Sequence, residues 1–456
     1  MNIAILVPVC SRKQTYSSIE EIPFLKYLYP SFQKTKEDGY NYSFFIGYDN
    51  DDEFYIKHSE TLKPFTQNIF YLEGCQHAPA TAWNKLAEYA FNSEIKYDYF
   101  FQIGDDIVLE TSNWTSAFIN KLNQKNDIGV VGPCHLNNYN GRIAQGKPYV
   151  IENAFVSRKH LEIFGYFFHP SIKNWYCDDW ITQVYKNIFS EIHIDYLCRN
   201  SVMDRYNINN CNGIQNLIDE GHDIITKYIN SHRCFSYCVF GNQKKYCLGM
   251  IKNLEQIKSL FPGYKVIIYL GNDVPQEYIN QYQNYDNVTL IRLDFTGLLV
   301  TIYRYLIIEE DYDVVFIRDT DSRFGDRDIW CINHFLNSDY KIFTIRDHQY
   351  QMRPLMAGQT GIKKIQNISI KEKLNEFIKE KSNINYYQND QDFIEKCIFN
   401  TYRENVIAYS QFYYMGEKER VIIPIPRKSD EDFCGNVYLF DENDNEYTEF
   451  TIHGRK

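Results

Sequence analysis

Short apolar segments alternate with amphipathic segments along this chain, and several of the apolar ones end in acidic residues. Each apolar segment predicts a buried β-strand; the segments span residues 3–8, 42–49, 97–106, 235–240, 265–273 and 312–321. Apolar residues at helical spacing predict helices over 79–91 and 249–260. Strands that alternate with helices are typical of a mostly parallel sheet covered on both faces, so the predicted fold class is α/β and Rossmann-like.

The second half of the chain repeats the first. Residues 97–106 (YDYFFQIGDD) align without gaps on residues 312–321 (YDVVFIRDTD), and the strands before them recur in the same order. Each half also has a later acidic cluster. We therefore expect two tandem domains of one kind, residues 1–228 and 229–456, with a boundary near 227–232.

Length and composition restrict the function further. A chain of 456 residues exceeds what one hydrophobic core usually serves. The net charge of -11 argues against a nucleic-acid partner, although a divalent cation can still neutralise a diphosphate in an acidic cleft. Without an export leader or an apolar run of membrane-spanning length, we expect a cytoplasmic protein with no membrane span. The 12 scattered cysteines predict reduced, mostly buried thiols.

Two carboxylates end the strand at 312–321. In an open α/β sheet the ligand lies beyond the carboxyl ends of the strands, where Asp319 and Asp321 fall. Alternate carboxylates on a turning chain can share Mg²⁺ or Mn²⁺, which also binds phosphate oxygens. The flanking Arg318 and Arg323 are expected to reach a diphosphate. The alternative is that these acids only cap the next helix.

The first half has Gly104, Asp105 and Asp106 at the equivalent place. Asp106 corresponds to Asp321 and is the better candidate metal ligand. Gly-Asp-Asp also occurs in the palm of RNA-dependent polymerases, but the acidic charge, the parallel α/β pattern and the lack of a recognisable fingers region argue against that function.

The later acidic cluster of the first half is a candidate general base. Asp178, Asp179 and Trp180 follow an aromatic-rich loop that could hold a sugar while a carboxylate takes a proton from its hydroxyl. Asp179 is favoured over Asp178 as the base. The alternative is a helix N-terminus, where acids are favoured by the helix dipole, and both can hold at once.

The first half resembles the GT-A glycosyltransferases of the inverting, family-2-like pattern, over about residues 1–200. The resemblance rests on the Leu6–Val9 strand with Arg12, the acids from Asp49 to Asp52, Trp83-Asn84, the Gly104–Asp106 strand end and the Asp178–Trp180 cluster. It implies a nucleotide pocket with Asp106 on the cation and Asp179 as base. The residues that it implies for that pocket are Pro8, Val9, Arg12, Asp49, Asn84 and Asp105.

The second half resembles another GT-A group, through residues 316–323, Ile345–His348, Met356–Gly358 with Gly361, and Asp390-Gln391-Asp392. The resemblance implies that Asp319 and Asp321 bind the metal diphosphate and that Asp390 is the base. Asp392 is a second acid of that cluster. The residues that it implies for the donor and acceptor cleft are Asp347, His348, Gly358 and Gln391. The layout is similar to two-domain glycosyltransferases of large DNA viruses.

These features together predict a glycosyltransferase that uses Mn²⁺ or Mg²⁺, a nucleotide-sugar donor such as a UDP-sugar, and a glycan acceptor. Two domains suggest consecutive transfers, with inversion expected in the first half and either inversion or retention in the second. A nucleotidyltransferase would need a basic or Gly-rich triphosphate cradle, which the sequence lacks. The other alternative is that one half only holds or scaffolds carbohydrate, and Gly104 makes the first half the better candidate.

Overall fold

The computed structural model describes residues 1–11, 14, 16–201, 213–381, 383–411 and 418–455. Their contacts divide the chain into two compact units, Met1–Thr226 and Lys227–Lys456. The division falls within helix α8 (Ile214–Ser231), at the start of the segment where the sequence predicts a boundary. No helix among the described residues has the length and apolar character needed to cross a membrane.

The first unit is built on an eight-stranded sheet with the order β3-β2-β1-β4-β7-β6-β8-β5. Its strands are β1 (Asn2–Val9), β2 (Asn41–Asp49), β3 (Asn68–Leu72), β4 (Tyr99–Gln102), β5 (Ile107–Leu109), β6 (Val130–His135), β7 (Phe155–Ser157) and β8 (Ser190–Asn200). Before α8, its helices are α1 (Tyr29–Thr35), α2 (Glu53–His58), α3 (Pro79–Phe91), α4 (Trp114–Asn123), α5 (Leu136–Ala144), α6 (Arg158–Phe164) and α7 (Cys177–Val184).

The second unit has an eight-stranded sheet with the order β11-β10-β9-β12-β14-β13-β15-β16. These strands are β9 (Arg233–Val239), β10 (Lys265–Leu270), β11 (Val288–Arg292), β12 (Val314–Arg318), β13 (Ile342–Arg346), β14 (Gln359–Lys363), β15 (Val406–Ser410) and β16 (Glu419–Val421). Two short hairpins follow: β17 (Leu439–Phe440) with β18 (Glu446–Tyr447), and β19 (Phe450–Thr451) with β20 (Gly454–Arg455). The helices are α9 (Lys244–Leu260), α10 (Gln276–Tyr282), α11 (Val300–Tyr303), α12 (Asp326–Leu336), α13 (Ile370–Glu380), α14 (Asn389–Ile394) and α15 (Asn400–Tyr402), and the 3₁₀ helix η4 covers Arg304–Glu309.

Seven strands follow the same order in the two sheets. In each unit the first three strands run parallel to one another and to the fourth, and one antiparallel strand, β7 or β14, follows in the sheet. The pairs β6–β8 and β13–β15 are parallel again. At the edges, β5 is antiparallel to β8, whereas β16 is parallel to β15. The prediction of two mostly parallel α/β sheets is confirmed.

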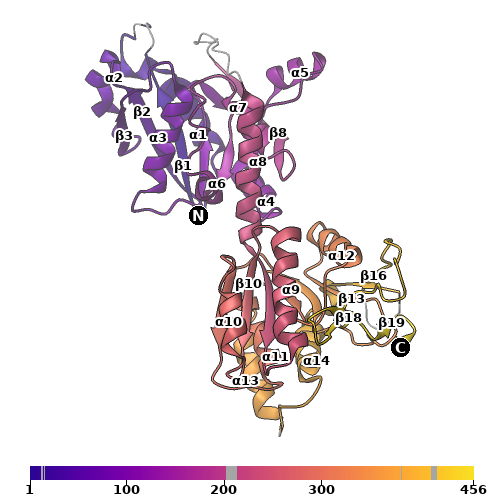
Figure 1. The fold of residues 1–456 in the computed structure, drawn as a ribbon. Coiled ribbons are helices and arrows are strands. Elements are labelled where there is room, and N and C mark those ends of the chain that lie inside the picture. Colours follow the sequence, from indigo (N-terminus) through magenta and orange to yellow (C-terminus); the bar gives the residue numbers. More distant parts are fainter. Residues whose placement is uncertain (12–13, 15, 202–212, 382, 412–417, 456) are drawn as a thin grey trace. The chain divides into compact units, whose positions relative to one another are not determined.

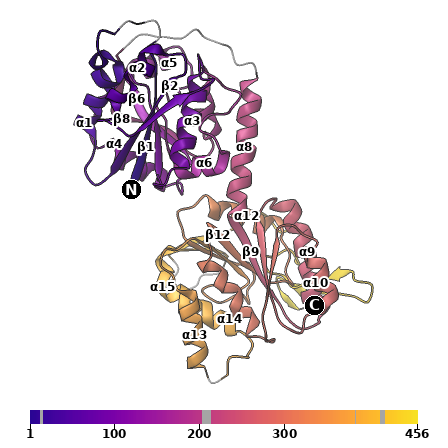
Figure 2. The ribbon, with the colours of Figure 1, turned by 90° about the vertical axis from the view of Figure 1, so that its left-hand side faces the viewer.

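Helices cover both faces of the second sheet. Because side chains alternate between the two faces along each strand, one strand contributes to the core on both sides. On β9, Phe235 and Tyr237 pack into the core beneath α9 and α12, whereas Cys234 and Cys238 face the core beneath α13 and α14. Figure 2 shows the same layering in the first unit, where α1 and α4 lie on one face of the sheet and α3 and α6 on the other. The sheets and helices of each unit can be followed in Figure 1.

The predicted strands are observed, although β4, β10 and β12 end before the predicted segments do, and the predicted helices agree with the observed ones except at the start of α9. Helix α3 has the predicted bounds, but α9 begins at Lys244 rather than Gly249. Gly249 lies inside the helix, where a Cβ atom would come within 2.5 Å of the Thr320 carbonyl oxygen. The glycine therefore lets the helix approach the end of β12, and Asn253 donates a hydrogen bond to the same carbonyl. The eleven described cysteines are free thiols, and ten of them are buried.

A buried histidine makes the stability of the first unit depend on pH. His160 is 1% exposed and lies between the hydroxyl of Tyr185 and the carbonyl of Phe167. Burial lowers the pKa of His160 to about 4, although the hydrogen bond to Phe167 opposes this. Between about pH 6.5 and pH 4 only the unfolded chain therefore takes up this proton, so stability falls as the pH falls.

We expect His160 to account for a loss on the order of 3 kcal/mol across that range. Urea unfolding of the first unit at several pH values, in the wild type and in His160→Gln, measures it. The variant should lose less stability than the wild type between pH 6.5 and pH 4. Identical pH dependence in the two proteins would contradict this assignment.

Candidate active site

The strand end at Asp319 and Asp321 opens into a cavity that several other predicted site residues also line. This cavity of the second unit has a volume of about 570 Å³. It is bordered by the ends of β9 and β12, the start of α9, the turn before α14 and the C-terminal hairpins. Its polar and charged lining includes Lys245, Arg304, Asp319, Asp321, Arg353, Asp390, Gln391, Glu449 and Arg455.

Arg304 joins two of the predicted site residues. Its side chain is 1% exposed, and its Nη1 donates to Asp319 Oδ1 at 2.6 Å and to the Arg318 carbonyl at 2.9 Å. Its Nη2 donates to Asp390 Oδ2 at 2.8 Å. One guanidinium therefore fixes the strand-end carboxylate beside the carboxylate that begins α14.

The neighbouring Asp321 is suited to a cation. Burial and the negative charge of Asp319 raise the pKa of Asp321 to about 6, while the ammonium group of Lys245 opposes the shift. Two carboxylates that disfavour each other's charge are stabilised by a shared cation. Among the described residues no cluster of three or more His, Cys, Asp and Glu forms a metal site. Two carboxylates completed by phosphate oxygens and water are nevertheless a common arrangement for Mg²⁺, so Asp319 and Asp321 fit such an ion.

Gly358 is placed directly against Asp319. A Cβ atom on Gly358 would lie 1.9 Å from Asp319 Oδ2 and 2.1 Å from its Cγ. Any larger residue would therefore displace the carboxylate. This contact gives a physical reason for glycine at this predicted cleft position.

The two acids of α14 differ in environment. Asp390 lines the cavity, where burial raises its pKa and Arg304 opposes the shift. Asp392 lies outside the lining, and its carboxylate accepts hydrogen bonds from Arg353 and Tyr386 at 2.9 and 2.7 Å. Although burial opposes it, these hydrogen bonds lower the pKa of Asp392. Asp390 thus lines the cavity, whereas Asp392, considered as catalytic from sequence, is held outside it by Arg353 and Tyr386.

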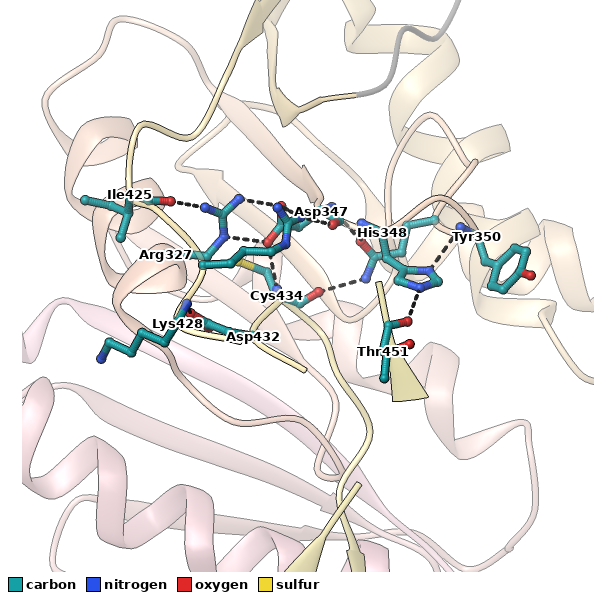
Figure 3. A network of polar contacts seen from close by, with 11 residues as sticks. Arg327, Asp347, His348, Tyr350, Ile425, Lys428, Asp432, Cys434 and Thr451 are labelled. Atoms are coloured by element: carbon teal, nitrogen blue, oxygen red, sulfur yellow. Dashed lines mark hydrogen bonds and ion pairs between the residues drawn. The ribbon is translucent and has the colours of Figure 1, made fainter. Parts of the chain in front are cut away.

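Asp347 and His348 fasten the C-terminal segment to the end of β13 (Figure 3). The Asp347 carboxylate is fully buried and bonds Arg327, Arg427 and the backbone N–H of Cys434. His348 Nε2 donates to the Thr451 carbonyl at 2.9 Å. These residues do not line the cavity, so the structure corrects the sequence-based cleft role: both act by holding the segment that does.

That C-terminal segment contributes a wall that the sequence did not predict. The residues that it adds to the cavity are Val437, Leu439, Glu449, Phe450 and Arg455. The backbone N–H of Tyr438 donates to the Asp321 carbonyl at 2.8 Å, which ties the segment to the strand end. The segment has no apolar periodicity, so no sequence signal marked it.

Arg318 and Arg323 do not face the cavity. Arg318 is 2% exposed and binds Asp328 and Gln359. Arg323 pairs with Glu446 of β18 and donates to backbone carbonyls of its own turn. The prediction that these arginines reach a diphosphate is wrong for this structure, because internal partners already use both guanidinium groups.

The first unit has a much smaller cavity at the equivalent strand ends, of about 30 Å³. Pro8, Val9, Asp49 and Asp105, four of the residues expected at a nucleotide pocket, line it. Asp106 lies half-buried at the end of the strand. Arg12 lies outside the described residues.

The later cluster of the first unit begins helix α7. Asp178 has a pKa raised well above its usual value, first by burial and then by the charge of Glu152. Asp179 is partly exposed and lies 3.5 Å from Arg142. Trp180 is fully buried and donates from Nε1 to the Leu217 carbonyl, so it packs in the core instead of lining a cleft.

Asn84 also has a structural role in place of the predicted cofactor contact. Its amide binds backbone groups of Phe167 and Phe168 at 2.7 to 3.1 Å. This contact fixes the aromatic loop that precedes α7. In the second unit, Gln391 lines the cavity and lies against the backbone of Leu355 and Ala357.

Comparisons with known proteins give only distant similarity. No protein-family model and no curated protein match the chain. The crystal structure of S. aureus TarS 1-349 aligns with a TM-score of 0.29 and 11% identity over 45% of this chain and 59% of that one. GalNAc-T7 with UDP, GalNAc and Mn²⁺ gives a TM-score of 0.31 and 9% identity over 50% of each chain.

A third structure, 4-diphosphocytidyl-2C-methyl-D-erythritolsynthase from Anaerococcus prevotii, gives a TM-score of 0.28 and 10% identity over 40% of this chain and 88% of that one. This chain spans 59% of the length of the TarS structure that it matches. Likeness at this level is too low to transfer residue roles. The function of the chain therefore has to be inferred from its own side chains.

Proposed function

We propose that the chain is a metal-dependent glycosyltransferase whose second unit moves a sugar from a nucleotide-sugar donor, with a UDP-sugar favoured, to a glycan acceptor. The observation that supports this is the shared position of Asp319, Asp321 and Asp390 on one cavity of about 570 Å³. Small-molecule sites typically measure about 300–1,000 Å³, so the cavity has the size that such a donor needs.

The side chains suit a single displacement with inversion. Asp390 would accept the proton of the acceptor hydroxyl as that oxygen bonds to the anomeric carbon and the bond to the diphosphate breaks. Arg304 would keep Asp390 ionised and in place. A divalent cation held by Asp319 and Asp321 would offset the charge on the departing diphosphate.

The mouth of the cavity suits a carbohydrate acceptor. Tyr350 and Tyr387 line the cavity, yet their side chains are 72% and 81% exposed. Exposed aromatic rings beside a polar site offer apolar faces to a sugar ring, while their hydroxyls remain free to hydrogen-bond. Tyr387 lies three residues before Asp390, which would bring an acceptor sugar close to the proposed base.

For the first unit we propose carbohydrate holding rather than transfer. The described residues at its strand ends enclose only about 30 Å³, too little for a nucleotide sugar. Two consecutive transfers, one by each unit, remain the alternative, and it requires this region to open. The variants Asp106→Ala and Asp321→Ala test both proposals.

Release of nucleoside diphosphate tests the proposal. The full chain is incubated with UDP- and GDP-sugars, Mn²⁺ or Mg²⁺ and candidate glycans, beside Asp106→Ala and Asp321→Ala. We expect metal-dependent release that Asp321→Ala abolishes and Asp106→Ala leaves unchanged. A loss in both variants would support two catalytic units. Pyrophosphate release from a nucleoside triphosphate and a sugar phosphate would instead identify a nucleotidyltransferase.

A further inference from the structure

The cavity of the second unit needs a cation that can meet the donor diphosphate, and the two arginines expected from sequence face elsewhere. Among the residues that the structure describes, four basic side chains line the cavity: Lys245, Arg304, Arg353 and Arg455. A phosphate-binding cation must be able to turn its charge toward the ligand. A side chain that is already paired with a carboxylate is therefore a weaker candidate for binding the diphosphate than one that is not.

The three arginines are already held by carboxylates. Arg304 binds Asp319 and Asp390. Arg353 pairs with Asp392 and Glu395 at 2.9 and 3.2 Å, and Arg455 pairs with Glu449. Recruiting any of them would break an ion pair, and for Arg304 it would leave two acids beside each other.

Lys245 has no such carboxylate partner in the described part of the chain. It lies in the first turn of α9, half-buried, with its Nζ 4.5 Å from the centre of the Tyr246 ring. No carboxylate of the described residues lies within ion-pair distance of its Nζ. Burial opposes its charged form, yet contacts with Tyr246 and the negative charge of Asp321 raise the pKa of Lys245 overall. A charged, partly desolvated ammonium group therefore faces the same space as the proposed metal ligand.

We propose that Lys245 binds the diphosphate of the nucleoside diphosphate donor and of the departing nucleoside diphosphate, an inference that rests on the proposed transferase function. An ammonium group without a carboxylate partner gains most from a ligand that brings negative charge. Lys245 lines the same cavity as Asp321 and can therefore contact the phosphate oxygens of a ligand there, whereas Arg304 is committed to Asp319 and Asp390. Tyr246 limits the directions that the side chain can take.

The preceding residue provides a matched control. Lys244 carries the same charge on the same helical turn, but it does not line the cavity and pairs with the exposed Asp444 at 2.5 Å. An exposed pair of this kind contributes little to stability. Lys244→Met and Lys245→Met therefore remove the same charge from adjacent positions, one outside the cavity and one inside it.

Calorimetric titration of the full chain with UDP and GDP, each with Mn²⁺, tests the inference, and uridine and guanosine serve as ligands without phosphate. We expect Lys245→Met to raise the Kd for the nucleoside diphosphate at least 10-fold and Lys244→Met to change it less than 2-fold. Lys245→Arg should restore most of the affinity, which shows that a lost fold does not explain the weaker binding. Binding of the nucleoside alone should be the same in all four proteins.

Each other outcome overturns the inference in a recognisable way. Equal affinity of Lys245→Met and wild type for the nucleoside diphosphate would refute the role of Lys245 and leave the transferase proposal intact. An equal loss in Lys244→Met would show a general effect of helix charge. Weakened nucleoside binding would assign Lys245 to the base instead. No binding of either nucleotide by the wild type would remove the transferase proposal together with this inference.

Discussion

Replacing Arg304 by methionine is expected to lower the rate of sugar transfer by roughly 1,000-fold, the scale seen when a catalytic site loses a preorganised electrostatic group. The change removes the guanidinium that binds both Asp319 and Asp390. The two carboxylates would then repel each other and leave the positions that the proposed mechanism requires. Breaking a buried pair also costs roughly 3 kcal/mol of stability, so the unfolding free energy is measured beside the rate.

Two further variants distinguish the effect of Arg304 on the positions of the carboxylates from its effect on stability. Arg304→Lys keeps the charge but cannot bind both carboxylates in the same fork, so it should restore stability more than rate. Arg353→Met removes another arginine of the same cavity, whose partners Asp392 and Glu395 lie away from the metal ligands. We expect a loss below 10-fold there. A folded Arg304→Met protein that retains more than a tenth of the wild-type rate would contradict the role given to Arg304.

Adding a single methyl group at Gly358 is expected to cost about 100-fold in rate, the scale of a 1 Å misplacement at a reacting centre. The new Cβ atom would overlap the Asp319 carboxylate, so the metal-binding position would be lost even though every acid remains. We expect the rate to fall far more than the unfolding free energy, because Asp319 is 48% exposed and can move toward the cavity. Higher Mn²⁺ concentrations should recover part of the rate.

Gly325→Ala is the matched control, because a Cβ there would meet Asp432 and Asp328 at ordinary contact distances of 3.6 and 3.8 Å. It should leave rate and stability nearly unchanged. If Gly358→Ala has the wild-type rate and Mn²⁺ dependence, Asp319 does not need its observed position and is not the metal ligand that we propose.

The sheets could be predicted from the sequence because their signals are local. A few consecutive apolar residues are enough to predict a buried strand. The gapless match between 97–106 and 312–321 predicted that the same architecture occurs twice. Asp319 and Asp321 could be found for the same reason, since they follow one strand directly. Ligands lie at the carboxyl ends of parallel strands in such sheets.

Arg304 could not be placed from sequence, because its second partner, Asp390, lies 86 residues away along the chain. Its one local signal is a charged residue inside the apolar stretch 298–308, and such residues are usually paired when buried. Arg318 and Arg323 were expected to reach a diphosphate for the converse reason. Their closeness to the acids is visible in sequence, but their distant partners Asp328 and Glu446 are not.

The most direct test of the central claim is the binding of Mn²⁺, followed by electron paramagnetic resonance, with and without UDP or GDP. The proposed site supplies two carboxylates and takes its remaining ligands from phosphate and water. The wild type should therefore bind one Mn²⁺ far more tightly when a nucleoside diphosphate is present, and Asp321→Ala should lose that ion. Mn²⁺ binding that ignores the nucleotide, or that persists unchanged in Asp321→Ala, would contradict the account.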